Sequence, residues 1–377
     1  MLGIAQTLAW ASSYYLPAIL ADPIARGIGV PRTWVFGAFS GALLIAAFAG
    51  PAVGRVIDRR GGRGVLAVSN IVLACGLAML AGSQGALTLF AAWSVLGIGM
   101  ALGLYDAGFA ALTALYGTEA RGPITGITLL AGFASTVSWP LSTFLNDTLG
   151  WRETLLVWAA LNLVVGLPLN ALLPASSQAA PHARAAPRKI GWKPYREMVL
   201  LAFVFAAAWF VTGAMAAHLP RLLERAGATP LVAIAAAALV GPAQVAARLV
   251  EFLLLRRGHP LISARFAAAL HPLGAVTLLL FGPPAAAAFA VLYGAGNGLL
   301  TIARGTVPLA VFGPDGYGER TGLLGAPARA AQAFAPLLFG ILLGRIGVSV
   351  VYVSAALCLA ALAALFGLHA RPQHSPV

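Results

Sequence analysis

The stretch GRVIDRRGGR, residues 54–63, places four arginines and one aspartate in ten positions. Such a concentration is unusual here, because only 9% of the 377 residues are charged, 60% are hydrophobic and the mean hydropathy is +0.88. A soluble domain of this length does not need so much apolar sequence for its core. The composition therefore indicates a membrane protein, in which a basic stretch belongs to a loop between spans.

Twelve apolar runs are separated by glycine, proline or charge, and each is long enough for a helix that crosses a bilayer, which takes about 20 residues. They cover residues 2–22, 33–57, 64–83, 86–115, 122–146, 152–173, 197–220, 231–255, 261–281, 285–312, 320–343 and 347–369. The first run has no basic segment before it and is followed at once by another, so we expect a membrane helix there and not a secretory signal. The expected fold class is an all-α membrane protein with twelve transmembrane helices.

The longest polar stretch, residues 174–197, divides these runs into two sets of six. We therefore expect an N-terminal six-helix bundle at 1–174, a cytoplasmic linker at 175–196 and a C-terminal six-helix bundle with a short tail at 197–377. The halves also resemble each other, because one offset of 196 positions relates Gly117, Gly126 and Pro140 to glycines and a proline of the second half. Parallel repeats of six helices are typical of one class of transporter.

The basic residues of the loops predict the orientation. With a cytoplasmic N-terminus, thirteen arginines and lysines fall on the cytoplasmic side and six on the outer side, so both termini are expected in the cytoplasm and the protein in the cell membrane. We attribute the net charge of +13 to contact with phospholipids and expect no nucleic-acid partner, because no basic stretch of the sequence resembles a nucleic-acid-binding module. The two cysteines lie in separate apolar runs and build no metal site. We expect a monomer that binds a small solute and the lipid bilayer.

Five residues of the opening stretch resemble the signature Gly-x-x-x-Asp-Arg/Lys-x-Gly-Arg-Arg of the major facilitator superfamily. They are Gly54, Asp58, Arg59, Gly61 and Arg63. Together with the twelve runs, the linker and the half repeat, the resemblance covers essentially the whole chain. It implies two pseudo-symmetric six-helix bundles, transport by alternating access, and a charged cluster that locks the two halves together on the cytoplasmic side. The alternative is that the arginines only fix topology and bind lipid phosphates.

Five ionisable residues lie within the apolar runs: Asp106, Arg248, Glu251, Arg304 and Arg329. Each costs roughly 2.5–3.5 kcal/mol to insert and is a functional candidate for that reason. For Asp106, a proton carrier, the counter-ion of an arginine and a substrate contact all stay open. Arg304 either binds an anion or pairs with Asp106. Arg248 and Glu251 are three residues apart, so they can pair on one helix face.

In the superfamily, the first, fourth, seventh and tenth helices line the central cavity and the second, fifth, eighth and eleventh flank it, so the resemblance places all five charges within reach of it. Three arginines suit a carboxylate, because a guanidinium binds two oxygens at once. The basic residues on the eighth and eleventh helices are similar to those of the oxalate–formate exchanger and the monocarboxylate porters. The predicted substrate-binding residues are Arg304, Arg248, Arg329, Tyr14, Trp10 and Asn297.

These features predict a secondary transporter, in the first instance a proton-coupled carrier of an organic anion with Asp106 or Glu251 carrying the proton. A proton-coupled multidrug or metabolite efflux antiporter is the alternative, and a non-transporting receptor or a channel is an alternative of another class. The enzyme motifs Gly-x-Ser-x-Gly, His-Glu-x-x-His and Gly-x-x-x-x-Gly-Lys do not occur in the sequence. We therefore expect neither an enzyme nor a cofactor, and we expect a proton gradient as the energy source.

Overall fold

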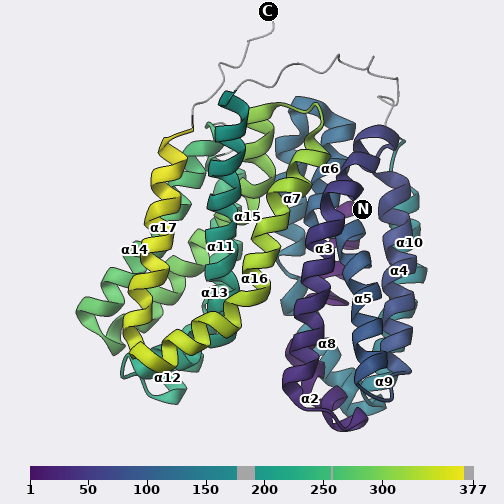
Figure 1. The fold of residues 1–377 in the computed structure, drawn as a ribbon, viewed down its shortest axis with the longest axis horizontal. Helices are drawn as coiled ribbons and strands as arrows, with labels where there is room; N and C mark the ends of the chain where they lie inside the picture. Colours follow the sequence, from purple (N-terminus) through teal and green to yellow (C-terminus); the bar gives the residue numbers. More distant parts are fainter. Residues whose placement is uncertain (176–191, 256–257, 369–377) are drawn as a thin grey trace, which may run out of the picture. The chain divides into compact units, whose positions relative to one another are not determined.

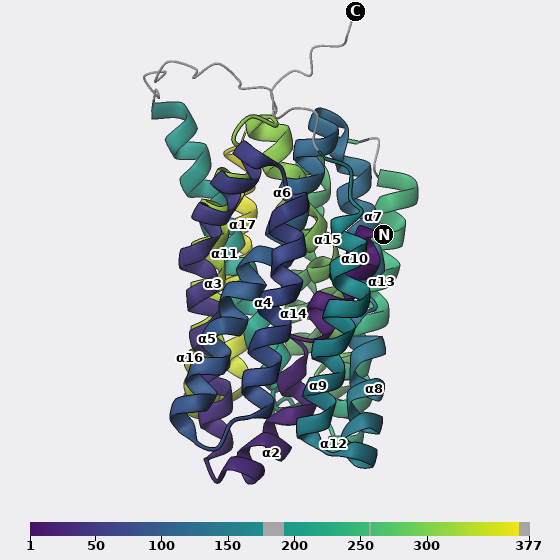
Figure 2. The ribbon, with the colours of Figure 1, turned by 90° about the vertical axis from the view of Figure 1, so that its right-hand side faces the viewer.

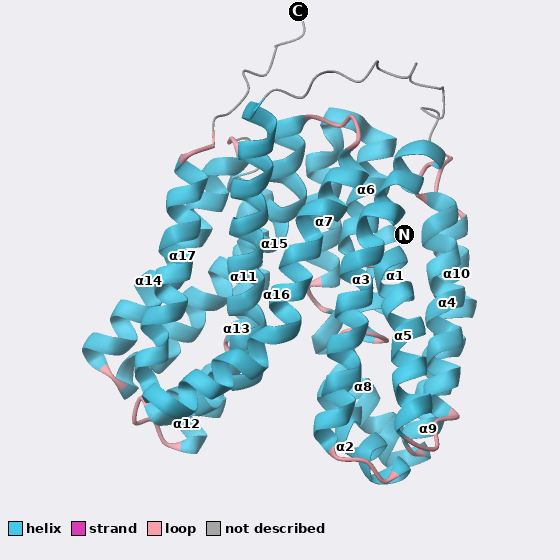
Figure 3. Ribbon diagram, in the orientation of Figure 1, coloured by secondary structure: helices cyan, strands magenta, loops and turns pink. Residues whose placement is uncertain are grey.

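The structure, a computed structural model, describes residues 1–175, 192–255 and 258–368. These residues are almost entirely helical, and Figure 3 shows no strand among them. The helices before the predicted linker are α1 (Leu2–Ala11), α2 (Leu16–Ile28), α3 (Arg32–Arg60), α4 (Arg63–Ala81), α5 (Ala86–Gly103), α6 (Tyr105–Tyr116), α7 (Arg121–Ala131), α8 (Ala134–Leu149), α9 (Trp151–Leu161) and α10 (Leu167–Ala171). Those after it are α11 (Trp192–Arg225), α12 (Pro230–Ala238), α13 (Val240–Val250), α14 (Pro260–Phe281), α15 (Ala286–Phe312), α16 (Tyr317–Ile346) and α17 (Val350–Phe366).

Short turns of other helical types complete the elements. Those with 3-10 geometry are η1 (Gly117–Ala120), η4 (Pro283–Ala285) and η5 (Gly347–Ser349). Those with the wider π geometry are η2 (Asn162–Gly166), which follows α9, and η3 (Glu251–Leu255), which follows α13. Single π turns often mark functional positions in membrane helices, and η3 begins at one of the predicted site residues.

Every one of the twelve predicted runs lies on helix. Nine helical segments of the described residues are long and apolar enough to cross a membrane. Two of them, Ala86–Leu149 with 64 residues and Tyr317–Phe366 with 50, each cover two predicted runs, since one crossing takes about 20 residues. The first predicted run is divided between α1 and α2. Most of the predicted linker and the C-terminal tail lie outside the described residues.

The chain forms two compact units. Unit 1 contains the described residues of Met1–Arg184 together with Gly316–Ala333, and unit 2 contains those of Ala185–Asp315 together with Phe334–Val377. Helix α16 therefore contributes its first part to unit 1 and its second part to unit 2. The domain boundaries predicted from the sequence, with a bundle at 1–174 and another at 197–377, stay a prediction.

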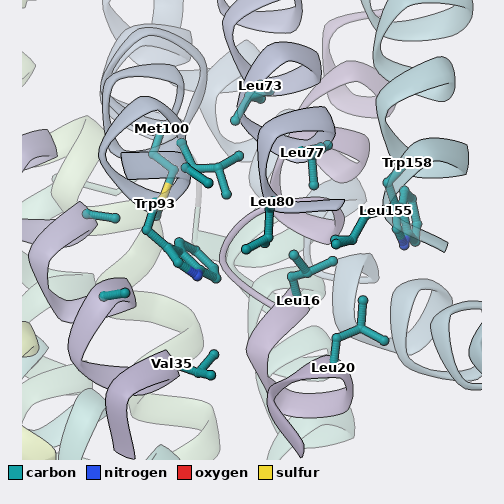
Figure 4. Close-up of a cluster of buried hydrophobic side chains, with 14 of the residues drawn as sticks. Leu16, Leu20, Val35, Leu73, Leu77, Leu80, Trp93, Met100, Leu155 and Trp158 are labelled. Carbon is teal, nitrogen blue, oxygen red and sulfur yellow. The ribbon is translucent and has the colours of Figure 1, made fainter. Parts of the chain in front are cut away.

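Unit 1 is built around an apolar core between α2, α3, α4, α5 and α9. Figure 2 shows α3, α4, α5 and α9 side by side, and Figure 4 shows Leu16, Leu80, Trp93 and Trp158, which are at most 2% exposed, packed in this core. Helix α5 approaches α3 closely at Gly97, where an added Cβ would lie 2.6 Å from the Ala42 carbonyl oxygen. Small residues allow such backbone approach, which is the main source of helix association within a bilayer.

Unit 2 is organised around α15. Figure 1 shows α11, α14 and α17 side by side, and α14 and α13 pack directly against α15. Gly294 and Gly298 lie one turn apart on α15, and a Cβ at either would come within 2.7 Å of a backbone carbonyl oxygen of α13. This close crossing brings the polar face of α13 against α15, which positions the buried arginines described below.

Two helices of unit 1 are interrupted inside the predicted spans. Between α1 and α2, residues 12–15 form a turn, and the hydroxyls of Ser12 and Ser13 donate hydrogen bonds to the carbonyl oxygens of Leu8 and Ala9. Between α5 and α6, Leu104 is extended, with φ −84° and ψ −173°. Interrupted helices expose backbone polar groups at membrane depth, and such groups need partners or line a site.

Candidate functional site

All five ionisable residues predicted to lie within spans are buried. Asp106, Arg248, Glu251, Arg304 and Arg329 are each at most 7% exposed, and within the described residues no other Asp, Glu, Lys or Arg is buried. Burial of a charge is costly unless a partner compensates it. The structure distributes these residues over the two units, with Asp106 and Arg329 in unit 1 and the other three in unit 2.

In unit 1, Arg329 of α16 forms an ion pair with Asp106 of α6. Nη2 of Arg329 lies 2.5 Å from Oδ2 of Asp106, and its Nη1 donates a 3.0 Å hydrogen bond to the carbonyl oxygen of Ala46 on α3. Gly50 makes room for the guanidinium, because a Cβ there would lie 3.1 Å from Nη1. Of the roles left open for Asp106, its place in this structure is that of the counter-ion of an arginine, and that arginine is Arg329.

The interruption at Leu104 determines where Asp106 lies. Asp106 is the second residue of α6, so its carboxylate lies at a helix N-terminus, where the helix dipole favours negative charge. The break leaves the carbonyl oxygen of Gly103 without its helical partner, and Nε2 of Gln6 donates a 2.7 Å hydrogen bond to it. The acid is therefore held at a broken helix by side chains from two other helices, α1 and α16.

Aromatic residues surround the interruption between α1 and α2. The ring of Trp10 lies 5.1 Å from that of Tyr14 and 4.7 Å from that of Tyr105, measured between centroids. Nε2 of Gln332 on α16 donates a 2.7 Å hydrogen bond to the hydroxyl of Tyr14. The two predicted aromatic contacts, Trp10 and Tyr14, are thus neighbours of the Asp106 helix and are linked to the same helix, α16, that provides Arg329.

The motif of the opening stretch lies at the end of α3 and contacts the start of α16, again within unit 1. The backbone N–H groups of Gly318 and Glu319 donate hydrogen bonds of 2.8 and 2.9 Å to the two carboxylate oxygens of Asp58. Arg55 pairs with Glu319 at 3.1 Å on the exposed side. Asp58 therefore caps the N-terminus of α16, an arrangement that the helix dipole stabilises.

Glycines allow α3 and α16 to touch along their backbones. Gly54 packs on the backbone of Gly318, and a Cβ at Gly322 would lie 2.6 Å from the carbonyl oxygen of Gly50. Both helices thus use Gly-x-x-x-Gly, a spacing that places two glycines on one face for close crossing. Of these four glycines, the predicted motif contains Gly54 alone; the spacing of Gly50, Gly318 and Gly322 is visible in the sequence and could have identified them.

The remaining motif residues lie at the end of α3 and in the loop that follows it. Gly61 ends α3 with φ +78°, a conformation that glycine adopts readily. Arg59 and Arg63 are exposed. Gly62, which lies outside the predicted set, packs directly on Ala111 of α6 and leaves no room for a side chain. Its contact connects the motif to the helix that carries Asp106.

In unit 2, Arg304 of α15 stacks on Trp209 of α11. Cζ of Arg304 lies 4.5 Å from the centroid of the indole ring, a cation–π contact between two residues that are each 7% exposed. Seven residues earlier on the same face of α15, Oδ1 of Asn297 accepts a 2.7 Å hydrogen bond from the hydroxyl of Thr212 on α11. The two predicted residues on α15 therefore both contact α11.

Arg248 reaches from α13 to the same face of α15. Its Nε lies 3.4 Å from the carbonyl oxygen of Gly298, and its Nη2 lies 3.4 Å from Oγ1 of Thr301 and 3.5 Å from Oε1 of Gln244. Thr301 is one turn from Arg304 on α15, so Arg248 contacts α15 one turn away from Arg304.

Glu251 begins the π turn η3 and is 1% exposed. Its Oε2 accepts a 2.7 Å hydrogen bond from the hydroxyl of Ser263 on α14. The predicted pairing of Arg248 with Glu251 stays a prediction. Within the described residues, no group of three or more His, Cys, Asp or Glu could hold a metal ion.

Comparisons with known proteins agree on one family. The model of the Major Facilitator Superfamily matches residues 2–306. An "MFS-type efflux pump" of Mycolicibacterium smegmatis is 31% identical over 220 residues, which are 55% of this chain and 50% of that relative, so the match spans about half the relative's length. Crystal structures of the human organic anion transporter MFSD10 (TETRAN) and the E. coli fucose:proton symporter FucP each align with a TM-score of 0.72 over 97% of both chains, at 17% and 15% identity. These matches confirm the predicted fold class and the prediction that the chain is not an enzyme.

Proposed function

The chain belongs to the major facilitator superfamily, and on that premise we propose that it is a secondary transporter of a small organic anion, driven by a proton gradient and working by alternating access. The observation that carries the choice of an anion is a pair of buried arginines in unit 2: Arg304 of α15, and Arg248 of α13, which contacts Thr301 one turn from Arg304. The names of the solved neighbours do not decide it, because their identity to this chain supports the fold alone.

The buried charges of unit 2 favour an anion. Arg248 and Arg304 contribute two positive charges and Glu251 one negative charge, so the buried ionised groups carry one net positive charge. In unit 1, Asp106 and Arg329 neutralise each other. A net buried cation is costly in a bilayer, and an anionic substrate would offset that cost. A cationic drug would add to it.

The chemistry of the arginines favours a carboxylate. A guanidinium presents parallel N–H donors that fit two carboxylate oxygens, and such bidentate pairs are stronger than contacts with a single point charge. We assign the main contact to Arg304, and we assign supporting contacts to Arg248 and to Asn297. Tyr14 and Trp10, in unit 1, stay predicted substrate contacts.

We further propose that protonation of Asp106 couples the proton to the substrate. The ion pair with Arg329 exists only while the Asp106 carboxylate is ionised. A proton on Asp106 would break this ion pair and release the positive charge of Arg329. Glu251 is the second candidate carrier, because it is an acid buried within a span and its Oε2 accepts a hydrogen bond from Ser263.

The motif residues are proposed to regulate the conformation. Gly54, Asp58, Arg59, Gly61 and Arg63 would hold the cytoplasmic end of α3 against the start of α16 and would release it during the transport cycle. This proposal includes cytoplasmic termini and a cytoplasmic-membrane location, as the loop charges predict.

Efflux of drugs or metabolites is the second candidate function. It is favoured by the relative from M. smegmatis, which is described as an efflux pump. Export of an organic anion would agree both with the description of this relative and with the buried arginines. Export of a lipophilic cation would place a further positive charge beside the buried residues of unit 2.

A binding screen followed by transport tests the proposal. The purified protein is heated with acetate, lactate, oxalate, succinate or benzoate, with glucose as a neutral control, and with ethidium or tetraphenylphosphonium as cations. Specific binding raises the unfolding temperature, by an amount that corresponds to about 2.7 kcal/mol at a ligand concentration 100 times Kd. The acid that stabilises most is then used for counterflow in proteoliposomes.

We expect Arg304→Gln to abolish stabilisation and counterflow, and we expect Arg225→Gln, which changes an exposed arginine at the end of α11, to leave both intact. Wild-type transport by Arg304→Gln would refute the anion site. Stabilisation by the two cations alone would refute the anion proposal and favour drug efflux.

A further inference from the structure

Helices α11 and α15 of unit 2 are joined by two polar contacts. Trp209 contacts Arg304, and three residues further along α11 the hydroxyl of Thr212 donates to Asn297. Because the partners on α15 run in the opposite direction, the two helices are antiparallel and these contacts form successive steps between them. The first is a cation–π contact between the indole and the guanidinium, and the second is a hydrogen bond to the amide oxygen of Asn297.

The contact with Trp209 restricts the plane of the Arg304 guanidinium. All five N–H groups of a guanidinium lie in its plane, so a ring that covers its face uses none of them. Cζ of Arg304 lies over the indole ring, 4.5 Å from its centroid, so the indole limits the orientations that the guanidinium can adopt. An arginine restricted in this way loses less freedom when it binds two oxygens at once.

We propose that Trp209 is a positioning residue that orients the fork of Arg304 toward the two oxygens of a carboxylate. This inference rests on the proposed function and names a residue that acts within that site. The indole would act through Arg304, without contact to the substrate. The step between Thr212 and Asn297 keeps α11 against α15 independently, so replacing the indole leaves the packing of the two helices in place.

Counterflow kinetics with the acid that stabilises the wild type most in the binding screen test the proposal. We expect Trp209→Leu, which removes the aromatic face, to raise KM about tenfold with little change in maximal rate, since a desolvated cation–π contact with Trp is worth about 1.4 kcal/mol or more. Trp209→Phe keeps a weaker face and is expected to raise KM about threefold, which preserves the test if the leucine variant does not fold. Phe210→Leu, a change at the neighbouring residue that packs against the core, is the matched control.

A double-mutant cycle separates positioning from packing. Lysine at 304 has no fork to orient, so Trp209→Leu should raise KM much less in an Arg304→Lys background than in the wild type. The inference would be overturned if KM rose equally in both backgrounds. It would also be overturned if Trp209→Leu kept the wild-type KM, with or without a loss of maximal rate. If the wild type binds and transports none of the acids of the binding screen, the proposed function itself fails, whereas failure of the Trp209 variants alone overturns only this inference.

Discussion

Replacement of Gly322 by alanine tests whether the crossing of α3 and α16 controls a conformational equilibrium. A Cβ at this position would lie 2.6 Å from the carbonyl oxygen of Gly50 and 2.7 Å from Cα of Pro51, whereas ordinary contacts begin at 3.4 Å. Because both obstacles are backbone atoms, no side chain can move aside. The helices must therefore separate locally by about 0.8 Å.

That separation has a calculable effect on the cap formed by Asp58. The bond from the Gly318 N–H would lengthen from 2.8 Å to about 3.6 Å, which is beyond the range of an N–H···O hydrogen bond. Bonds to charged acceptors contribute about 1.5–3 kcal/mol each when shielded, and the partial exposure of this cap argues for the lower end. A loss of about 1.4 kcal/mol changes the ratio of joined to separated states tenfold.

Distances between spin labels at the exposed positions Arg60 and Leu323, in a cysteine-free background, report the separation of α3 from the first part of α16. We expect Gly322→Ala to increase the separated population about tenfold and to lower counterflow. The matched control is Gly344→Ala, the same change on the same helix, where a Cβ meets nothing within 4 Å. Identical distance distributions in wild type and Gly322→Ala, or an equal change in Gly344→Ala, would refute the reasoning.

Three further outcomes are expected. Asp58→Asn should keep surface expression but lower transport, because it removes the negative charge at the N-terminus of α16; unchanged transport would reduce the motif to a topological role. Asp106→Asn should destabilise the purified protein by about 3–5 kcal/mol, since it leaves Arg329 buried without its acid, and adding Arg329→Gln should restore much of the loss in thermal unfolding; no recovery would contradict the pairing. A reporter fused after Val377 should be active only in the cytoplasm, and activity only outside would reverse the proposed topology.

Hydropathy predicted the helices well, because the length of an apolar run is set by the bilayer and not by the partners of the helix. The two interruptions are different. The break at Leu104 is stabilised by Gln6, which lies 97 residues earlier and donates to Gly103. No local pattern contains that contact, so residues 86–115 could only be predicted as one continuous helix.

Burial of the five charged residues was predictable from the cost of inserting a charge, but their partners were not. Asp106 could be assigned an arginine as counter-ion, and three arginines were at comparable depth. The choice of Arg329 depends on how α16 packs against α3 and α6, which the hydropathy pattern does not contain. The same holds for Trp209, an aromatic residue in an alanine-rich segment whose role depends on its neighbour from α15.

The residues of α16 that contact α3 and Tyr14 lie on one face of the helix. Gly318, Gly322, Arg329 and Gln332 recur at intervals of three, four or seven residues and so share one face of the helix. Their partners on α3 run in the opposite direction, from the Gly54–Asp58 end toward Ala46. At the first two positions the backbones touch and no side chain fits, whereas at the last two a long side chain spans the gap to its partner. The same register continues at the next residue of α16, where the hydroxyl of Ser40 on α3 donates a 3.3 Å hydrogen bond to the carbonyl oxygen of Ala333, and it brings Arg329 to the interrupted helix that carries Asp106.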